Sequence, residues 1–186
     1  LSNSSIYNNT SPLGGGISAT DNASISLLDN VNIYGNEALT GSGLGGGISI
    51  QNRAVVVIEG TSGISENSGL KGGGVYIDNA SLYLIGKDAG IMSNSAATDD
   101  GNGGGIYGTN NAYIAIENGA EVYSNSAGYT GGGIYVDLYS TLWVKMGSIY
   151  DNTSGYSGGG IYADNLALVD FEMGGYTCDT PPCMKM

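Results

Sequence analysis

The chain has few of the residue types on which most catalytic, metal-binding and nucleic-acid-binding sites depend. Among 186 residues there is no histidine, one phenylalanine, one tryptophan, two cysteines and three prolines, and only five residues are lysine or arginine. The formal net charge is −12. Because nucleic acids and anionic bilayers attract basic faces, we expect neither a nucleic-acid partner nor direct membrane insertion. The longest apolar runs also fall short of the ~18 residues that a membrane-spanning helix needs.

The cysteines lie close together, as Cys178 and Cys183, with four residues between them. This spacing does not fit a CxxC redox motif, and no histidine or further cysteine is present to complete a zinc site. We expect a short local disulfide in an oxidising compartment, with two unpaired thiols as the alternative. The sequence starts at Leu1 without an initiator methionine or a signal peptide, which favours a processed product or a fragment.

Glycine, by contrast, is abundant and regularly placed. There are 34 glycines, and glycine triplets recur at spacings of 31, 27, 31, 28 and 27 residues, beginning at Gly14, Gly45, Gly72, Gly103, Gly131 and Gly158. The regular spacing and a hydrophobic content of 41% argue against a disordered linker. A repeat of this period predicts a solenoid.

A second signature ends in asparagine, as in Ile33-Tyr34-Gly35-Asn36. An asparagine follows the first glycine of a triplet by 22 residues in four repeats and by 21 in the last, at Asn36, Asn67, Asn94, Asn125 and Asn152. The distance from each asparagine to the next triplet varies from 5 to 9 residues. A constant stretch therefore alternates with a variable loop. We expect these asparagines to form an internal ladder, each amide bonding to the next rung.

Three short runs of alternating apolar residues lie in each constant stretch, as in Val75-Tyr76-Ile77 and Leu82-Tyr83-Leu84. Strands this short bury their apolar face only when rungs stack on one another. The sequence thus predicts an all-β fold, a right-handed parallel β-helix of about six three-strand rungs. It would be a single domain over 1–186, with a partial rung at 1–13, repeats at 14–175 and a tail at 176–186.

Asparagines also recur at the turn before the second strand, where a left-handed backbone is tolerated. They are Asn22, Asn52, Asn79, Asn111 and Asn165. The fifth repeat has Leu138 nearby instead, which is a local break in this pattern.

The two signatures together resemble the GGA(I/L/V) and FxxN repeats of chlamydial polymorphic outer-membrane proteins and related autotransporter passengers. The resemblance covers residues 6 to about 175. Here glycine stands in place of alanine, and isoleucine or valine in place of phenylalanine. The resemblance implies a secreted, surface-displayed β-helix with an adhesive role.

Tyrosines at one outward position on four successive rungs are candidates for glycan binding. They are Tyr76, Tyr107, Tyr135 and Tyr162. A flat aromatic stripe stacks on sugar rings or on a neighbouring fibre. The alternative is that stacked tyrosines only stabilise adjacent strands.

Acidic side chains suggest a weak calcium site, either at Asp99 and Asp100 or in the column of Asp137 and Asp164. A solvated turn is the favoured interpretation of Asp99 and Asp100. Acidic-sugar lyases need basic groups, so we do not expect an enzyme or any other cofactor. Four exposed acceptor motifs are possible glycosylation sites, at Asn3, Asn8, Asn22 and Asn79.

The predicted ends lack capping helices, and the last run, Tyr176 to Asp179, is weak. We therefore expect an extracellular or cell-surface structural protein, either a fibre subunit that binds itself head to tail or a segment of an adhesin. A module that binds host or matrix glycans through its tyrosines is the alternative, and a polysaccharide-cleaving enzyme ranks last.

Overall fold

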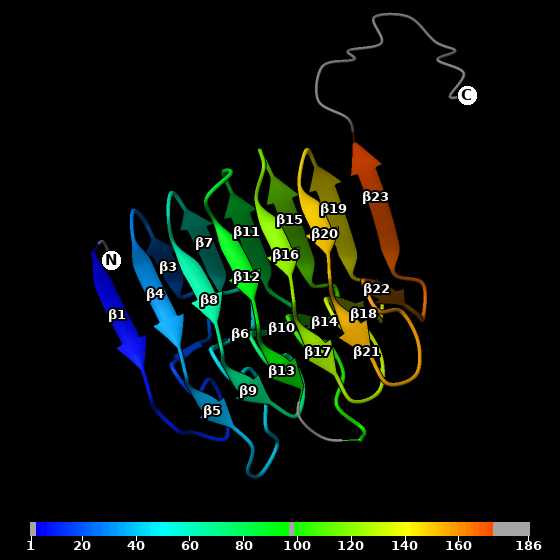
Figure 1. Cartoon of the computed structure of the whole chain (residues 1–186), viewed down its shortest axis with the longest axis horizontal. Helices are drawn as coiled ribbons and strands as arrows, with labels where there is room; N and C mark the ends of the chain where they lie inside the picture. The colour runs from blue at the N-terminus through cyan, green and yellow to red at the C-terminus, as the bar shows by residue number, and fades with distance from the viewer. Residues whose placement is uncertain (1–2, 97–98, 173–186) are drawn as a thin grey trace, which may run out of the picture.

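The computed structural model describes residues 3–96 and 99–172, which form a parallel β-solenoid of about six turns (Figure 1). The strands lie across the long axis, and every pairing between strands is parallel. In Figure 1 the near strands run downward and the far strands upward while the chain advances from left to right, which is a right-handed coil. The predicted fold class is confirmed.

Three long sheets form the faces of the coil, and we number them by their order after each glycine triplet. The first sheet contains β2 (Ile17–Ala19), β6 (Ile48–Gln51), β10 (Val75–Asp78), β14 (Ile106–Thr109), β18 (Ile134–Val136) and β22 (Ile161–Ala163). The second contains β3 (Ser24–Leu27), β7 (Val55–Glu59), β11 (Ser81–Ile85), β15 (Tyr113–Glu117), β19 (Thr141–Lys145) and β23 (Leu168–Glu172). The third contains β1 (Ser4–Tyr7), β4 (Val31–Tyr34), β8 (Gly63–Ser65), β12 (Gly90–Met92), β16 (Glu121–Tyr123) and β20 (Ser148–Tyr150).

A fourth sheet of two-residue strands refines the expected three-strand rung. It contains β5 (Glu37–Ala38), β9 (Ser68–Gly69), β13 (Ser95–Ala96), β17 (Ser126–Ala127) and β21 (Thr153–Ser154). Each of these strands directly follows a ladder asparagine and pairs in parallel with its counterpart on the next rung. Two residues are too few to show an alternating pattern, so the sequence placed them in the variable loop.

The core is built from the inward positions of the three long sheets. In β11 the side chains of Leu82 and Leu84 are fully buried, whereas Tyr83 between them points outward. Leu82 stacks in register between Val56 and Ile114 on the neighbouring rungs. Each such aliphatic side chain contributes about 1.5–3 kcal/mol on full burial, so stability accumulates rung by rung. No helix in the described ranges is long and apolar enough to cross a membrane.

The glycine triplet forms a corner in which backbone packs directly on backbone. The first glycine has a positive φ, as at Gly72 with +65°. At the second, Gly73, an added Cβ would lie closer than 3.0 Å to the backbone of Ser95 and to the carbonyl of Gly104. At the third, Gly74, it would lie 2.7 Å from the carbonyl oxygen of Gly105. Only glycine therefore allows this corner to close.

The turn between the first and second sheets has two consecutive residues with positive φ on most rungs. Asn110 and Asn111 have φ of 53° and 63°, the pattern of a type I′ turn. Leu138 and Tyr139 adopt the same conformation, with φ of 48° and 64°. The asparagine pattern breaks at Leu138 but the backbone turn does not, because the neighbouring rungs impose their turn on two residues that disfavour it.

Candidate functional site

The asparagine ladder runs inside the corner between the third and fourth sheets. Asn67 is 1% exposed, and its side-chain Nδ2 donates to Oδ1 of Asn94 at 3.0 Å and to the carbonyl of Ile33 at 2.9 Å. The backbone N–H of Asn67 also donates to Asn94 Oδ1, at 3.0 Å. The same pattern repeats at Asn36, Asn94 and Asn125, and Asn152 accepts from Asn125 and donates to the carbonyl of Val122. Each buried amide thus has its hydrogen-bonding groups satisfied, and its role is structural.

The ladder has a direction. Each asparagine from Asn9 to Asn125 donates its N–H and one Nδ2–H toward the rung nearer the C-terminus, beginning with Asn9, which donates to Asn36 Oδ1 at 3.0 and 2.9 Å. Within the described residues, the ladder ends with an acceptor, Asn9 Oδ1, at one end. At the other end it has a donor, the backbone N–H of Asn152.

Tyr76, Tyr107, Tyr135 and Tyr162 form a continuous ring stack on the outer side of the first sheet. Their centroids are 5.5, 4.6 and 5.4 Å apart, with interplanar angles of 14°, 6° and 16°. Tyr76 and Tyr107 are only 7% and 6% exposed. Because each ring covers the face of the next, the column presents ring edges to solvent. Sugar rings pack on open faces, so this geometry favours cross-strand stabilisation over glycan stacking.

A row of polar side chains accompanies this stack two residues further along each strand. The hydroxyl of Tyr135 donates to Asp137 Oδ2 at 3.2 Å, and that of Tyr76 to Asp78 Oδ2 at 3.4 Å. Burial, and after it the nearby carboxylates, raises the pKa of the Tyr76, Tyr107 and Tyr135 hydroxyls far above the ordinary value for tyrosine. These hydroxyls therefore act as neutral hydrogen-bond donors.

The four candidate calcium ligands lie in two different environments. Asp99 and Asp100 are exposed in a turn, and Asp164 is also exposed. Asp137 is 7% exposed, and its Oδ1 has no partner among the described residues. Residues 3–96 and 99–172 contain no group of three or more acidic, histidine or cysteine side chains placed to hold a metal ion. The described residues therefore provide no set of metal ligands around either of the proposed calcium sites.

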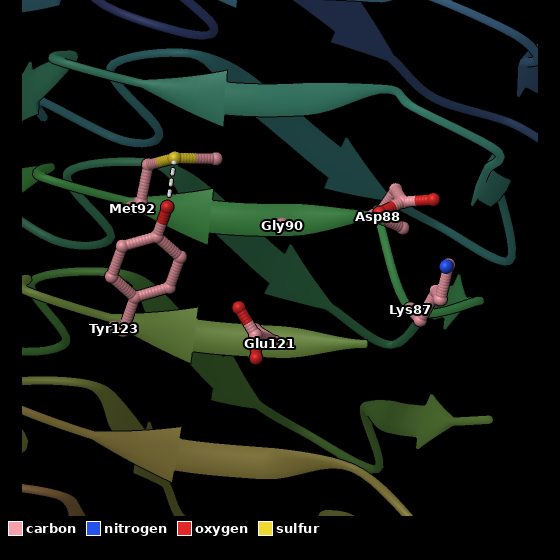
Figure 2. A pocket seen from close by; sticks show the side chains of 7 residues that line it. Lys87, Asp88, Gly90, Met92, Glu121 and Tyr123 are labelled. Carbon is pink, nitrogen blue, oxygen red and sulfur yellow. Dashed lines mark hydrogen bonds between the residues drawn. The ribbon is translucent and has the colours of Figure 1, made fainter. Parts of the chain in front are cut away.

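A shallow depression of about 240 Å³ lies on the outer side of the third sheet (Figure 2). Gly90 leaves room there for the Met92 side chain, whose sulfur accepts a hydrogen bond from the Tyr123 hydroxyl at 2.8 Å. Lys87, Asp88 and Glu121 also line it. Glu121 is already bonded to another group, because the Tyr150 hydroxyl donates to it at 3.1 Å. Met92 thus fills the space beside Gly90, while Lys87 and Asp88 are exposed and Glu121 is partly buried.

A second aromatic surface, which the sequence reasoning missed, covers the outer side of the second sheet. Tyr83, Tyr113 and Trp143 occupy outward positions on β11, β15 and β19. They escaped notice because they do not repeat one residue type in one column. The available signal was that outward positions of three successive second strands carry aromatic residues instead of polar ones.

The four possible glycosylation sites, Asn3, Asn8, Asn22 and Asn79, are all exposed and all have a positive φ. Their side chains are accessible, and modification stays a prediction. Cys178, Cys183 and the run from Tyr176 to Asp179 lie outside the described residues.

No protein-family model matches this chain, and no curated protein or solved structure is significantly similar to it.

Proposed function

We propose that the chain is an extracellular or cell-surface structural protein, a rod that extends by stacking end to end on further copies of itself. It would serve as a fibre subunit or as a segment of an adhesin. The direction of the asparagine ladder carries this proposal. The acceptor at Asn9 and the donor at Asn152 are complementary, so one copy can continue the ladder of the next.

The strand edges at the two ends of the described coil are complementary in the same way. At one end β1, β2 and β3 each pair with a single neighbour, and so do β20, β22 and β23 at the other. Apolar inward side chains stay only partly buried there, including Ile17 and Ile25 at the first end and Ile161 and Val169 at the second. Phe171 is 58% exposed. Stacking would bury both edges and give a contact that does not close on itself, hence a fibre.

The resemblance of the repeat to autotransporter passengers supports the surface location, since those passengers are displayed outside the cell. The described residues include few buried charged side chains, and parallel strands pair along every face of the coil. Both features suit a rigid rod with a structural role. The stacked tyrosines of the first sheet add stiffness along the same axis.

Assembly can be tested with variants that block one end each. Ile25→Asp disables the first end, and Val169→Asp disables the second, because each places a charge in the apolar edge. We expect the unaltered protein to form filaments by electron microscopy and light scattering. Each variant alone should be monomeric, and an equimolar mixture should form dimers through the two intact ends.

The matched control is Leu138→Asp, which changes a partly exposed side chain in the turn between β18 and β19, two strands that each pair on both sides, and it should leave filaments intact. Circular dichroism would check that all variants keep their β-sheet content. If the unaltered protein stays monomeric at high concentration, the end-to-end proposal fails.

A further inference from the structure

The outer side of the second sheet carries a column of four uncharged side chains on successive rungs. Val57, Tyr83, Ala115 and Trp143 are paired in register across β7, β11, β15 and β19. Tyr113 lies beside Ala115 on the same face. We call Tyr83, Tyr113, Ala115 and Trp143 the Trp143 platform. Its position on the side of the coil separates it from both ends, so it does not depend on end-to-end assembly.

The small residue in the platform is completely covered. Ala115 alternates outward between the inward residues Ile114 and Ile116, yet it is 0% exposed. The larger side chains around it, Tyr83, Tyr113 and Trp143, must therefore lean over it. Tyr83 and Tyr113 are 5.7 Å apart and tilted by 49°, so they are not stacked face to face like the tyrosines of the first sheet. The three rings thus cover Ala115 and are themselves only partly buried.

A polar row borders the platform on one side. The Lys145 ammonium lies over the Trp143 ring, 5.2 Å from its centre, and is 3.6 Å from the Glu172 carboxylate, so a ligand that stacks on that face has to displace it. Glu117 pairs in register with Lys145. Hydroxyl-rich ligands combine an apolar ring face with hydroxyls that need donors and acceptors, and this row offers both beside the aromatic rings.

Charge decides between the possible occupants. A second copy facing this surface would bring Glu117, Asp170 and Glu172 close to the same carboxylates of its partner. Polyanions would be repelled for the same reason. An uncharged ligand avoids this repulsion.

The spacing indicates the shape of the ligand. Tyr83 and Trp143 are two rungs apart in one column, which is about 10 Å at the usual separation of strands. In an extended β-linked polysaccharide every second sugar ring presents the same face, and this repeat is of comparable length. We propose that the Trp143 platform binds an uncharged, extended β-linked polysaccharide, with Tyr83 and Trp143 stacking on alternate sugar rings.

Trp143 is the single tryptophan of the chain, so its fluorescence reports directly on this surface. The full chain would be titrated with cellohexaose as the neutral probe and with polygalacturonate as the acidic one. We expect cellohexaose to shift the emission to shorter wavelength and polygalacturonate to leave it unchanged. By calorimetry, Tyr83→Ala and Trp143→Ala should each weaken cellohexaose binding by about tenfold or more.

Tyr129→Ala is the matched control, since Tyr129 is an exposed aromatic residue that stacks with Tyr156 elsewhere on the molecule. It should bind cellohexaose as the unaltered protein does. Three outcomes would overturn the proposal: no binding of cellohexaose at saturating concentration, tighter binding of polygalacturonate, or a dimer in sedimentation analysis that Trp143→Ala dissociates. Thermal melts of both platform variants would show that they stay folded.

Discussion

The backbone N–H and the side-chain amide of Asn94 both donate to one oxygen, Oδ1 of Asn125, at 3.0 Å each. The same side chain also donates to the carbonyl of Ile64 at 2.9 Å. Asn94 is 1% exposed, so water cannot replace these partners. The identity of the side chain, and not only its volume, is therefore fixed.

Asn94→Asp should lower the free energy of unfolding by roughly 3 kcal/mol. The carboxylate has no hydrogen to donate, so it faces the oxygens of Asn125 and Ile64 while carrying a buried charge. Chemical denaturation would measure the change. Asn118→Asp is the matched control, because Asn118 is exposed at a turn with a φ of 56° that aspartate also tolerates. Equal losses for the two variants would contradict the ladder as a source of stability.

Gly73→Ala should be among the most damaging single-methyl additions in the chain. Its Cβ would meet the backbone of Ser95 and Gly104, and backbone on a stacked rung cannot move aside. We expect a loss of at least ~2 kcal/mol in unfolding free energy. Gly63→Ala is the comparison, since its nearest neighbour, at 3.3 Å, is the flexible end of Met92. Similar melting temperatures for both variants would show that the corner is looser than its geometry indicates.

The turn at Leu138 and Tyr139 offers a stabilising substitution. Both residues have a positive φ, which costs free energy for side chains of this size. Leu138→Asn together with Tyr139→Gly should raise the free energy of unfolding by ~1 kcal/mol or more, because Asn-Gly is the preferred type I′ pair. Leu138→Ala keeps the strain while removing the exposed side chain, so it serves as the control. If the double variant and the unaltered protein have the same melting temperature, the strain argument is contradicted.

The stacked tyrosines predict a fall in stability at alkaline pH. Burial, followed by the nearby carboxylates, raises the pKa of Tyr76, Tyr107 and Tyr135 in the folded state above the unfolded value. The folded state then holds more protons than the unfolded chain above about pH 10. The contribution of these neutral tyrosines to the free energy of unfolding is therefore complete below about pH 10. It is lost as the pH rises through the folded-state pKa.

This loss should appear as unfolding that coincides with the absorbance of tyrosinate as the pH is raised. Tyr76→Phe should move the alkaline midpoint upward, since one buried hydroxyl no longer ionises. Tyr156→Phe should leave it unchanged, because Tyr156 is 74% exposed. Ionisation of all tyrosines at their ordinary pKa without unfolding would contradict the prediction.

The sequence was sufficient for the architecture because the features that define a rung recur at fixed offsets. The distance from Gly72 to Asn94 places a corner and a ladder position on every turn, and the alternation around Leu82 assigns the buried face. Leu138 shows a limit of such reasoning. The asparagine pattern breaks there, yet hydrogen bonds to the adjacent rungs hold its backbone in the same turn as on most other rungs.

The candidate sites were harder to predict, because they depend on the directions and neighbours of side chains. The repeat placed Tyr76 and Tyr107 in one column but did not show that their rings would cover one another. Conversely, Tyr83 and Trp143 share a column with Ala115 between them, and sequence alone gives no sign that the alanine would be fully covered.

The arrangement of the strands across the long axis also sets the mechanical behaviour of the coil. The hydrogen bonds between rungs run along this axis, and the last described strand, β23, is held by β19 alone. A force that pulls the two ends apart therefore loads one rung at a time, starting from an open edge. Each rung stores 27 to 31 residues, and its release lengthens the chain by about 100 Å. The coil would yield under tension in regular steps and would recover by rewinding onto the rungs that remain.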